Sequence, residues 1–245
     1  MTAEHHDEQS GRAAGLLVVV AVPAEAEAVL RGLRDGARPL PLPGGELRRA
    51  VHPDGTAVDV LAAGVGPAAA AAGTAAALGR YGGYRLVLSA GIAGGFAPHA
   101  PIGSLVVADA LVAADLGAET PDGFADVTEL GFGTVRHEVP AGVVRLAANA
   151  LAAAVGEVLT VSTVTGSAER AERLRERHPR ALAEAMEGFG VAEAAARHGL
   201  PVGELRAVSN AVGPRDRAAW RIGEALGALE RAFTALPPNR LLQEV

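Results

Sequence analysis

The chain has 245 residues, is 49% hydrophobic and carries a formal net charge of −6, so it can bury the core of one large α/β domain. It contains no lysine and no cysteine, which excludes a Schiff-base or phosphate-loop lysine, disulfides, thiol nucleophiles and thiolate metal sites. The negative charge gives no general attraction to nucleic acid or to an anionic membrane, and it favours a small-molecule partner.

The N-terminal region joins a polar stretch to an apolar run. Residues 1–12 are expected to form a disordered tail, and residues 13–245 a single domain. The run "LLVVVAV" could belong to a secretory signal, but acidic rather than basic residues precede it, so a buried parallel strand is favoured. No apolar run approaches the roughly 20 residues that span a bilayer, and we expect a cytoplasmic protein.

Apolar runs rich in β-branched residues alternate with Ala-rich segments along the rest of the chain, which is typical of an α/β fold. The pattern predicts strands over residues 16–22, 57–62, 85–90, 104–108, 157–161, 181–186 and 202–208. It predicts helices over residues 24–33, 67–78, 142–153, 169–177, 188–198 and 217–236, with "PPN" at 237–239 ending the last one. The loop over residues 116–137 is longer than a plain connection, which marks it as a candidate functional loop.

Candidate functional residues follow the predicted strands, where open α/β sheets bind ligands. Glu25 follows the first strand, the glycines of "AGVGP" and "SAGIAGGF" follow the next two, and Ser209 with Asn210 ends the last. Taken singly, the glycines could make tight turns and Glu25 could be a solvated acid at a helix start. Glu187 differs, because a carboxylate in so apolar a stretch should be paired or functional rather than buried alone.

Other chemically active residues have simpler interpretations. The histidines are scattered, so we expect no metal and no cofactor. Trp220 is interpreted as an aromatic that packs a helix. Arg215 and Asp216 form either a surface ion pair or part of a site rim.

Six motifs in chain order resemble the nucleoside phosphorylase and nucleosidase superfamily. They are "AVPAEAEAV", "SAGIAGGF", "ADVTELGFG", "TGSAERAERL", "AMEGFGVA" and "RAVSNAVG". The resemblance covers most of the chain and implies an α/β fold, a three-layer α/β/α sandwich with a twisted mixed central sheet. Within the superfamily, "MEGFGVA" followed by "SNAVGPRDRAAWRI" is most similar to the futalosine hydrolases, bacterial menaquinone-pathway enzymes that release hypoxanthine from futalosine.

Two alternatives stay open. One is a nucleosidase that acts on methylthioadenosine or S-adenosylhomocysteine, whose members place an aspartate where Asn210 stands. The other is a catalytically silent nucleoside-binding protein on the same fold, since a fold does not fix a function.

The resemblance also implies roles for individual residues. Glu187 would hold the ribose hydroxyls, and Glu25 would take a proton from water, with Glu27 as the alternative if the register differs by two residues. Asn210 and Ser209 would face the purine. The other implied substrate-binding positions are Ile92, Ala93, Gly94, Ser167, Ala168, Met186 and Gly188.

Hydrolysis rather than phosphorolysis is favoured by what the motifs lack. The family's phosphorylases carry arginines before the glycine loop and after the first strand, whereas Ser89 and the acidic "PAEAE" stand there in this chain. A phosphate dianion would meet carboxylates, so water is the expected nucleophile. Superfamily members are commonly homo-oligomers, and we expect the loop over residues 124–132 to contribute to such an interface.

Overall fold

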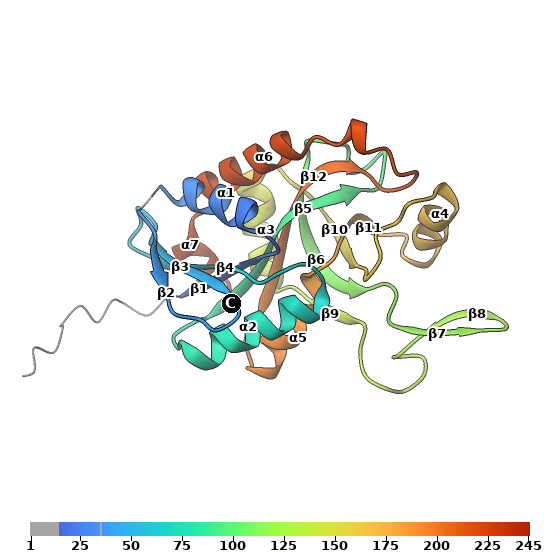
Figure 1. Ribbon diagram of the computed structural model, residues 1–245, viewed down its shortest axis with the longest axis horizontal. Helices are drawn as coiled ribbons and strands as arrows, with labels where there is room; N and C mark the ends of the chain where they lie inside the picture. The colour runs from blue at the N-terminus through green and yellow to red at the C-terminus, as the bar shows by residue number, and fades with distance from the viewer. Residues whose placement is uncertain (1–14, 35) are drawn as a thin grey trace, which may run out of the picture.

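The computed structural model describes residues 15–34 and 36–245 of the chain. The expected tail over residues 1–12 lies outside the described residues. A ten-stranded sheet that mixes parallel and antiparallel pairs lies between two layers of helices (Figure 1). This confirms the predicted three-layer α/β/α fold with a mixed central sheet.

The strands of the large sheet follow one another along the chain as β1 (Leu16–Val20), β2 (Arg38–Leu40), β3 (Glu46–Val51), β4 (Ala57–Ala62), β5 (Leu86–Gly95), β6 (Leu105–Ala113), β9 (Arg136–Glu138), β10 (Ala154–Thr160), β11 (Ala181–Ala185) and β12 (Val202–Ala211). Their order across the sheet is β11-β10-β6-β12-β5-β1-β4-β3-β2, with β9 paired to β6. Strand β1 pairs in parallel with β4 on one side and β5 on the other, and all five of its residues are buried. Burial on both faces explains its continuous run of apolar residues.

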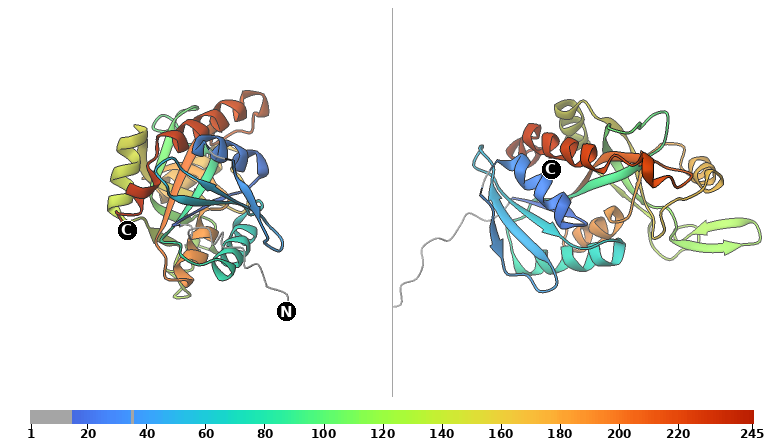
Figure 2. Two further views of the ribbon diagram at one scale, coloured as in Figure 1. Left: turned by 90° about the vertical axis from the view of Figure 1, so that its left-hand side faces the viewer. Right: turned by 45° about the horizontal axis from the view of Figure 1, so that its top comes forward.

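The helices are α1 (Pro23–Leu33), α2 (Pro67–Arg80), α3 (Ala141–Leu151), α4 (Ala168–Arg177), α5 (Gly188–Arg197), α6 (Ile222–Ala235) and the short α7 (Pro238–Leu241). On one face of the sheet α1 packs on α6, with α3 beside them, and on the other face α2 packs on α5 (Figures 1 and 2). Helix α1 begins with Pro23 at its first position, where the missing N–H costs no helical hydrogen bond.

Strand β5 departs from the sequence prediction. The prediction ended the strand at residue 90 and placed the following glycines in a loop, but β5 continues through them to Gly95. Its far end pairs antiparallel with β11, with Gly94 opposite Glu184. The sheet therefore closes on itself through β5, β12, β6, β10 and β11, and glycines make this possible because they leave room where strands and side chains approach closely.

The predicted helix over residues 217–236 is also wrong at its start. A 3₁₀ turn at Arg217–Ala219 is followed by Trp220 in an extended conformation (φ −71°, ψ 134°), and α6 begins only at Ile222. The "PPN" segment does end α6, but it then starts α7.

The long loop over residues 116–137 has its own structure. Strands β7 (Gly117–Thr120) and β8 (Gly123–Asp126) form a separate two-stranded hairpin, and β9 returns the chain to the large sheet. The hairpin projects away from the body of the molecule (Figures 1 and 2). No helix in the described part of the chain is long and apolar enough to cross a membrane.

Candidate active site

Glu25 lies in the first turn of α1, and its carboxylate turns back toward the end of β1. The residue is 3% exposed, and the carboxylate accepts hydrogen bonds from the backbone N–H groups of Ala21 (2.9 Å), Val22 (3.2 Å) and Ile92 (2.8 Å). The close approach depends on Gly91, because a Cβ at that position would lie 2.5 Å from Glu25 Oε1. Three backbone donors therefore fix this acid at the edge of the sheet.

Glu27, the alternative to Glu25, is directed elsewhere. Its Oε1 accepts a hydrogen bond from Arg48 Nη1 at 2.7 Å, and about half of its side chain is exposed. The geometry favours Glu25 as the acid of the site.

Glu187 lies at the junction of β11 and α5, where the sequence predicted a strand to turn into a helix. The residue is 5% exposed. Its Oε1 accepts a hydrogen bond from the N–H of Gly66 at 3.2 Å, and its Oε2 accepts one from the N–H of Met186 at 3.3 Å. Gly66, the second glycine of "AGVGP", thus belongs to the same candidate site as Glu187 of the "MEG" motif.

Arg206, in β12, joins the two acids and was missed by the sequence analysis. Its side chain is fully buried, and Nη2 lies 3.4 Å from Glu187 Oε2 and 3.0 Å from Ser89 Oγ. A Cβ on Gly91 would lie 2.8 Å from Arg206 Nη1 as well as against the carboxylate of Glu25. The guanidinium and both carboxylates therefore meet in one buried cluster.

Glu204 adds a third carboxylate to this cluster. Its Oε1 accepts a hydrogen bond from Arg206 Nε at 2.7 Å, and its Oε2 has no hydrogen-bond partner among the described residues. The residue packs against Gly188, where a Cβ would lie 2.4 Å from Glu204 Oε2. Glu204 and Arg206 are two residues apart and so lie on one face of the strand. The sequence signal that could have revealed this pair was the presence of two opposite charges, two residues apart, in a strand predicted to be buried.

The charges in the cluster are unequal, since three carboxylates surround one guanidinium. Burial raises the pKa of Glu25 above its ordinary value, while the N–H of Ile92 and the charge of Arg206 lower it in part. Burial also raises the pKa of Glu204 against the attraction of Arg206. The two places where the family's phosphorylases carry arginines hold Ser89 and the acidic "PAEAE" segment, as the sequence shows, and Arg206 reaches the cluster from a third place, in β12.

Ser209 and Asn210 lie beside the cluster at the end of β12. Ser209 Oγ is 3.2 Å from the carbonyl oxygen of Ala93 and 2.8 Å from Asn210 Oδ1. Asn210 Nδ2 donates to the carbonyl oxygen of Ala211 at 3.0 Å and lies 3.3 Å from where a Cβ of Gly94 would be. The predicted purine-facing residues and the glycines of β5 are thus brought together.

A cavity beside Asn210 extends this part of the site. It is lined by Gly94, Val164, Thr165, Glu184, residues 210–215 and Trp220.

Gly94 and Asn210 are the predicted site residues that line this cavity, and Ser167 and Ala168 are among those that stand outside it. Ser167 caps α4, where its Oγ accepts a hydrogen bond from the backbone N–H three residues later at 3.2 Å, and Ala168 is the exposed first residue of the helix. Val164 and Thr165 line the wall instead. In the motif "TGSAE" it is therefore Thr165, together with the preceding Val164, that lines the cavity, and not Ser167 or Ala168.

The rim of the cavity includes residues that the sequence left ambiguous. Arg215 and Trp220 both line it, and the guanidinium carbon of Arg215 lies 5.3 Å from the centre of the indole. Asp216 accepts a hydrogen bond from the N–H of Ala218 at 3.0 Å and so caps the 3₁₀ turn. Trp220 thus lies at the cavity between the 3₁₀ turn and α6, and Arg215 lies at the cavity beside it.

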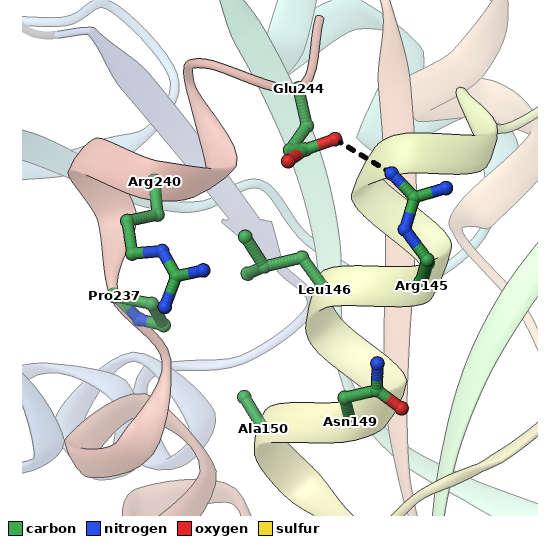
Figure 3. A pocket seen from close by; sticks show the side chains of 7 residues that line it. All are labelled: Arg145, Leu146, Asn149, Ala150, Pro237, Arg240 and Glu244. Atoms are coloured by element: carbon green, nitrogen blue, oxygen red, sulfur yellow. Dashed lines mark hydrogen bonds and ion pairs between the residues drawn. The ribbon is translucent and has the colours of Figure 1, made fainter.

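Further cavities lie away from these residues. One of about 360 Å³ lies between α3 and the C-terminal segment, where Arg145 Nη2 pairs with Glu244 Oε2 at 3.2 Å (Figure 3). Another of about 570 Å³ opens between the β7–β8 hairpin and the arginines of α4. Neither contains a predicted site residue. Within residues 15–34 and 36–245, no group of three or more His, Asp or Glu side chains is arranged to hold a metal ion.

Comparisons with known proteins identify the family of the chain. The family model described as the phosphorylase superfamily matches residues 16–236. The futalosine hydrolase of Streptomyces coelicolor is 65% identical over 234 residues, which cover 91% of this chain and 95% of that protein.

Solved structures show the same fold. A mutant MTAN of Helicobacter pylori with 5′-methylthioadenosine in its active site has a TM-score of 0.77 at 22% identity, covering 96% of this chain and all of that one. The native futalosine hydrolase of Helicobacter pylori has a TM-score of 0.76 at 21% identity, covering 94% and 97%. The chain belongs to the phosphorylase superfamily and, within it, to the futalosine hydrolase family.

Proposed function

We propose that this protein hydrolyses the N-ribosidic bond of futalosine, releasing hypoxanthine and dehypoxanthine futalosine, in menaquinone biosynthesis. The observation that carries the proposal is the meeting of Glu25 and Glu187 around buried Arg206, beside the cavity of Asn210. The 65% identity to a futalosine hydrolase supports the choice of substrate.

Glu187 would hold the ribose. Its two oxygens are oriented by the N–H groups of Gly66 and Met186, and a carboxylate has capacity left to accept hydrogen bonds from two adjacent hydroxyls. Breaking the C1′–N9 bond leaves positive charge on the sugar in an oxocarbenium-like transition state. The negative charge of Glu187 would stabilise that charge as it develops.

Glu25 would act as the general base. The electron pair of the C1′–N9 bond leaves with the purine, the oxygen of a water molecule bonds to C1′, and one water proton passes to Glu25. The raised pKa of Glu25 suits this role, because it makes the ionised carboxylate a stronger base. The purine leaves as an anion and takes a proton from solvent, while Glu25 returns its proton to solvent, so one water molecule is consumed for each hypoxanthine released.

Asn210 would face the purine. Its amide carries both a donor and an acceptor, so it can donate to O6 or N7 of hypoxanthine without a change of protonation state. Ser209 fixes the amide, since its hydroxyl lies 2.8 Å from Asn210 Oδ1.

Arg206 would not serve as a phosphate clamp. Its guanidinium contacts Glu204 and Glu187, and Glu25 lies beside it, so the local charge is negative when the acids are ionised. A phosphate dianion would be repelled by this cluster, whereas a water molecule would not.

A homo-oligomer is part of the proposal. Phe132 is 81% exposed and Leu130 is 39% exposed, and both follow the projecting hairpin. Large apolar side chains exposed together mark an interaction surface, and a second copy of the chain is the partner that the superfamily resemblance implies. Size-exclusion chromatography with light scattering tests this, and Phe132→Ser should shift the protein toward the monomer.

The substrate assignment is tested by assaying futalosine beside methylthioadenosine in phosphate-free buffer. We expect hypoxanthine from futalosine, with a higher kcat/KM than that for methylthioadenosine. Preference for methylthioadenosine would identify a nucleosidase of the related group, and binding of either compound without purine release would identify a silent binding protein.

A further inference from the structure

Glu184 is a buried acid that the proposed mechanism does not use. It is 6% exposed, lies in β11 and lines the same cavity as Asn210. Its position follows from the closure of the sheet, which the sequence analysis did not predict.

Glu184 and Asn210 flank one glycine. Gly94 of β5 pairs with Glu184 on β11 and with Asn210 on β12. Paired residues on neighbouring strands point to the same face of a sheet, and the two outer strands are roughly 10 Å apart at the usual strand spacing. Because Gly94 has no side chain, the space above it between the Glu184 carboxylate and the Asn210 amide is left open.

Glu184 also has a structural contact. Its Oε1 accepts a hydrogen bond from the N–H of Thr165 at 2.8 Å, and its Oε2 accepts one from Thr165 Oγ1 at 2.5 Å. These bonds anchor the loop that precedes α4. A carboxylate offers about four lone-pair sites, so the acid keeps capacity for a further donor in the cavity.

The two purine classes differ at the edge that would face such an acid. A 6-oxopurine presents N1–H as a donor beside O6 as an acceptor. A 6-aminopurine presents N1 as an acceptor beside an amino group as a donor. An ionised carboxylate can accept a hydrogen bond from N1–H of a 6-oxopurine. Opposite the unprotonated N1 of a 6-aminopurine, the carboxylate and N1 are both acceptors and make no hydrogen bond.

We infer that Glu184 accepts a hydrogen bond from N1–H of the bound 6-oxopurine and determines the preference of the enzyme for 6-oxopurine over 6-aminopurine nucleosides. The inference rests on the proposed function for the identity of the substrate. It assigns to Glu184 the part of the purine that Asn210 does not contact.

The test is Glu184→Gln, which keeps the shape of the side chain and can still bond Thr165 through both of its terminal atoms. The ratio of kcat/KM for futalosine to that for its 6-amino counterpart should fall on the order of tenfold to a hundredfold, because the amide can donate to N1 of the aminopurine. Glu157→Gln is the matched control. Glu157 is another buried acid, on the neighbouring strand β10, but it pairs with Arg136 Nη1 at 2.8 Å outside the cavity, so the ratio should not change.

Thr165→Val separates recognition from loop anchoring. It removes the hydroxyl that bonds Glu184 but leaves the carboxylate, so the preference for the 6-oxopurine should persist even if both rates fall. An equal loss on both substrates in Glu184→Gln, with the ratio unchanged, would overturn the inference and leave Glu184 as a loop anchor.

Calorimetric binding of free hypoxanthine and adenine distinguishes this inference from the proposed function. Unmodified protein that binds hypoxanthine more tightly, and loses that preference in Glu184→Gln, supports the inference even if futalosine is not cleaved. Cleavage of futalosine with no change of purine preference in the variant would overturn the inference alone.

Discussion

Arg206 Nη2 lies 3.4 Å from Glu187 Oε2, and both side chains are almost completely buried. The arginine therefore contacts the acid to which the proposal assigns the ribose hydroxyls, while its Nε donates a hydrogen bond to Glu204 Oε1. A buried ion cluster of this kind is sensitive to the loss of one partner, because the remaining charges are left without compensation.

Arg206→Gln should lower turnover and stability together. Removing one partner of a buried ion pair costs about 3–5 kcal/mol in the free energy of unfolding, which urea denaturation measures. Arg31→Gln is the control, because Arg31 pairs with Glu230 at 2.7 Å on the surface and its loss should cost less than about 1 kcal/mol. Equal losses in the two variants would contradict the role of the cluster.

Glu25→Gln and Glu187→Gln should each abolish most turnover while the fold stays intact, since both keep shape and remove charge. Loss of a positioned general base lowers the rate on the order of 10²–10⁴. Glu27→Gln should keep near-normal kcat, because Glu27 pairs with Arg48 at the surface. Steady-state kinetics measure these effects. An inactive Glu27→Gln variant together with an active Glu25→Gln variant would identify Glu27, and not Glu25, as the general base.

The pH dependence of kcat/KM should follow Glu25. The base works when ionised, so activity should fall as the pH drops through its pKa, and burial places that pKa above the ordinary 4.5 despite the opposing effects of Ile92 N–H and Arg206. Glu187 lies close and adds to the upward shift. A pH–rate profile that stays flat down to 4.5 would show that Glu25 is not the base.

The same shift has a consequence for stability. Folded protein holds the Glu25 proton more tightly than the unfolded chain does, so this stabilisation is fully present below the unfolded pKa and is lost as the pH rises through the raised one. Glu25→Gln should therefore make the free energy of unfolding less dependent on pH across that window. Urea titrations at several pH values measure the slope, with Glu27→Gln expected to behave as the unmodified protein does.

Asn210→Asp should narrow or reverse the preference for futalosine over its 6-amino counterpart. An aspartate accepts from a 6-amino group and, when protonated, can donate to N7, whereas the amide suits a 6-oxopurine. A wrong polar partner in the site costs about 1–3 kcal/mol, or on the order of tenfold to a hundredfold in kcat/KM. An unchanged ratio would mean that Asn210 does not contact the purine.

The sequence predicted the central strands and the flanking helices because their apolar runs are long and fully buried. It could not predict that β5 runs on through Gly91 to Gly95, since glycines usually mark turns. Here the glycines are strand residues at which a side chain would not fit. A Cβ on Gly91 would meet the carboxylate of Glu25, and a Cβ on Gly94 would meet Val212 and Asn210. The resulting closure of β5 onto β11 depends on long-range pairing that no local pattern encodes.

The site was predicted where a motif or a lone charge marked it. Glu187 stood out as an acid in an apolar run, and Glu25 was marked by its motif. Arg206 was overlooked because an arginine within a strand is most simply interpreted as an exposed residue. Its burial depends on Glu204, which compensates its charge from the same strand, and on Ser89 of β5, which accepts a hydrogen bond from it.

The most direct test of water as the nucleophile is the cleavage of futalosine with and without inorganic phosphate, with the sugar product identified by ³¹P NMR and mass spectrometry. Because the charge of Arg206 is balanced by surrounding carboxylates, we predict full turnover in phosphate-free buffer, free hypoxanthine and a sugar product without phosphorus. A rate that requires phosphate, or a sugar 1-phosphate among the products, would contradict hydrolysis and the assignment of Glu25 as the base that activates water.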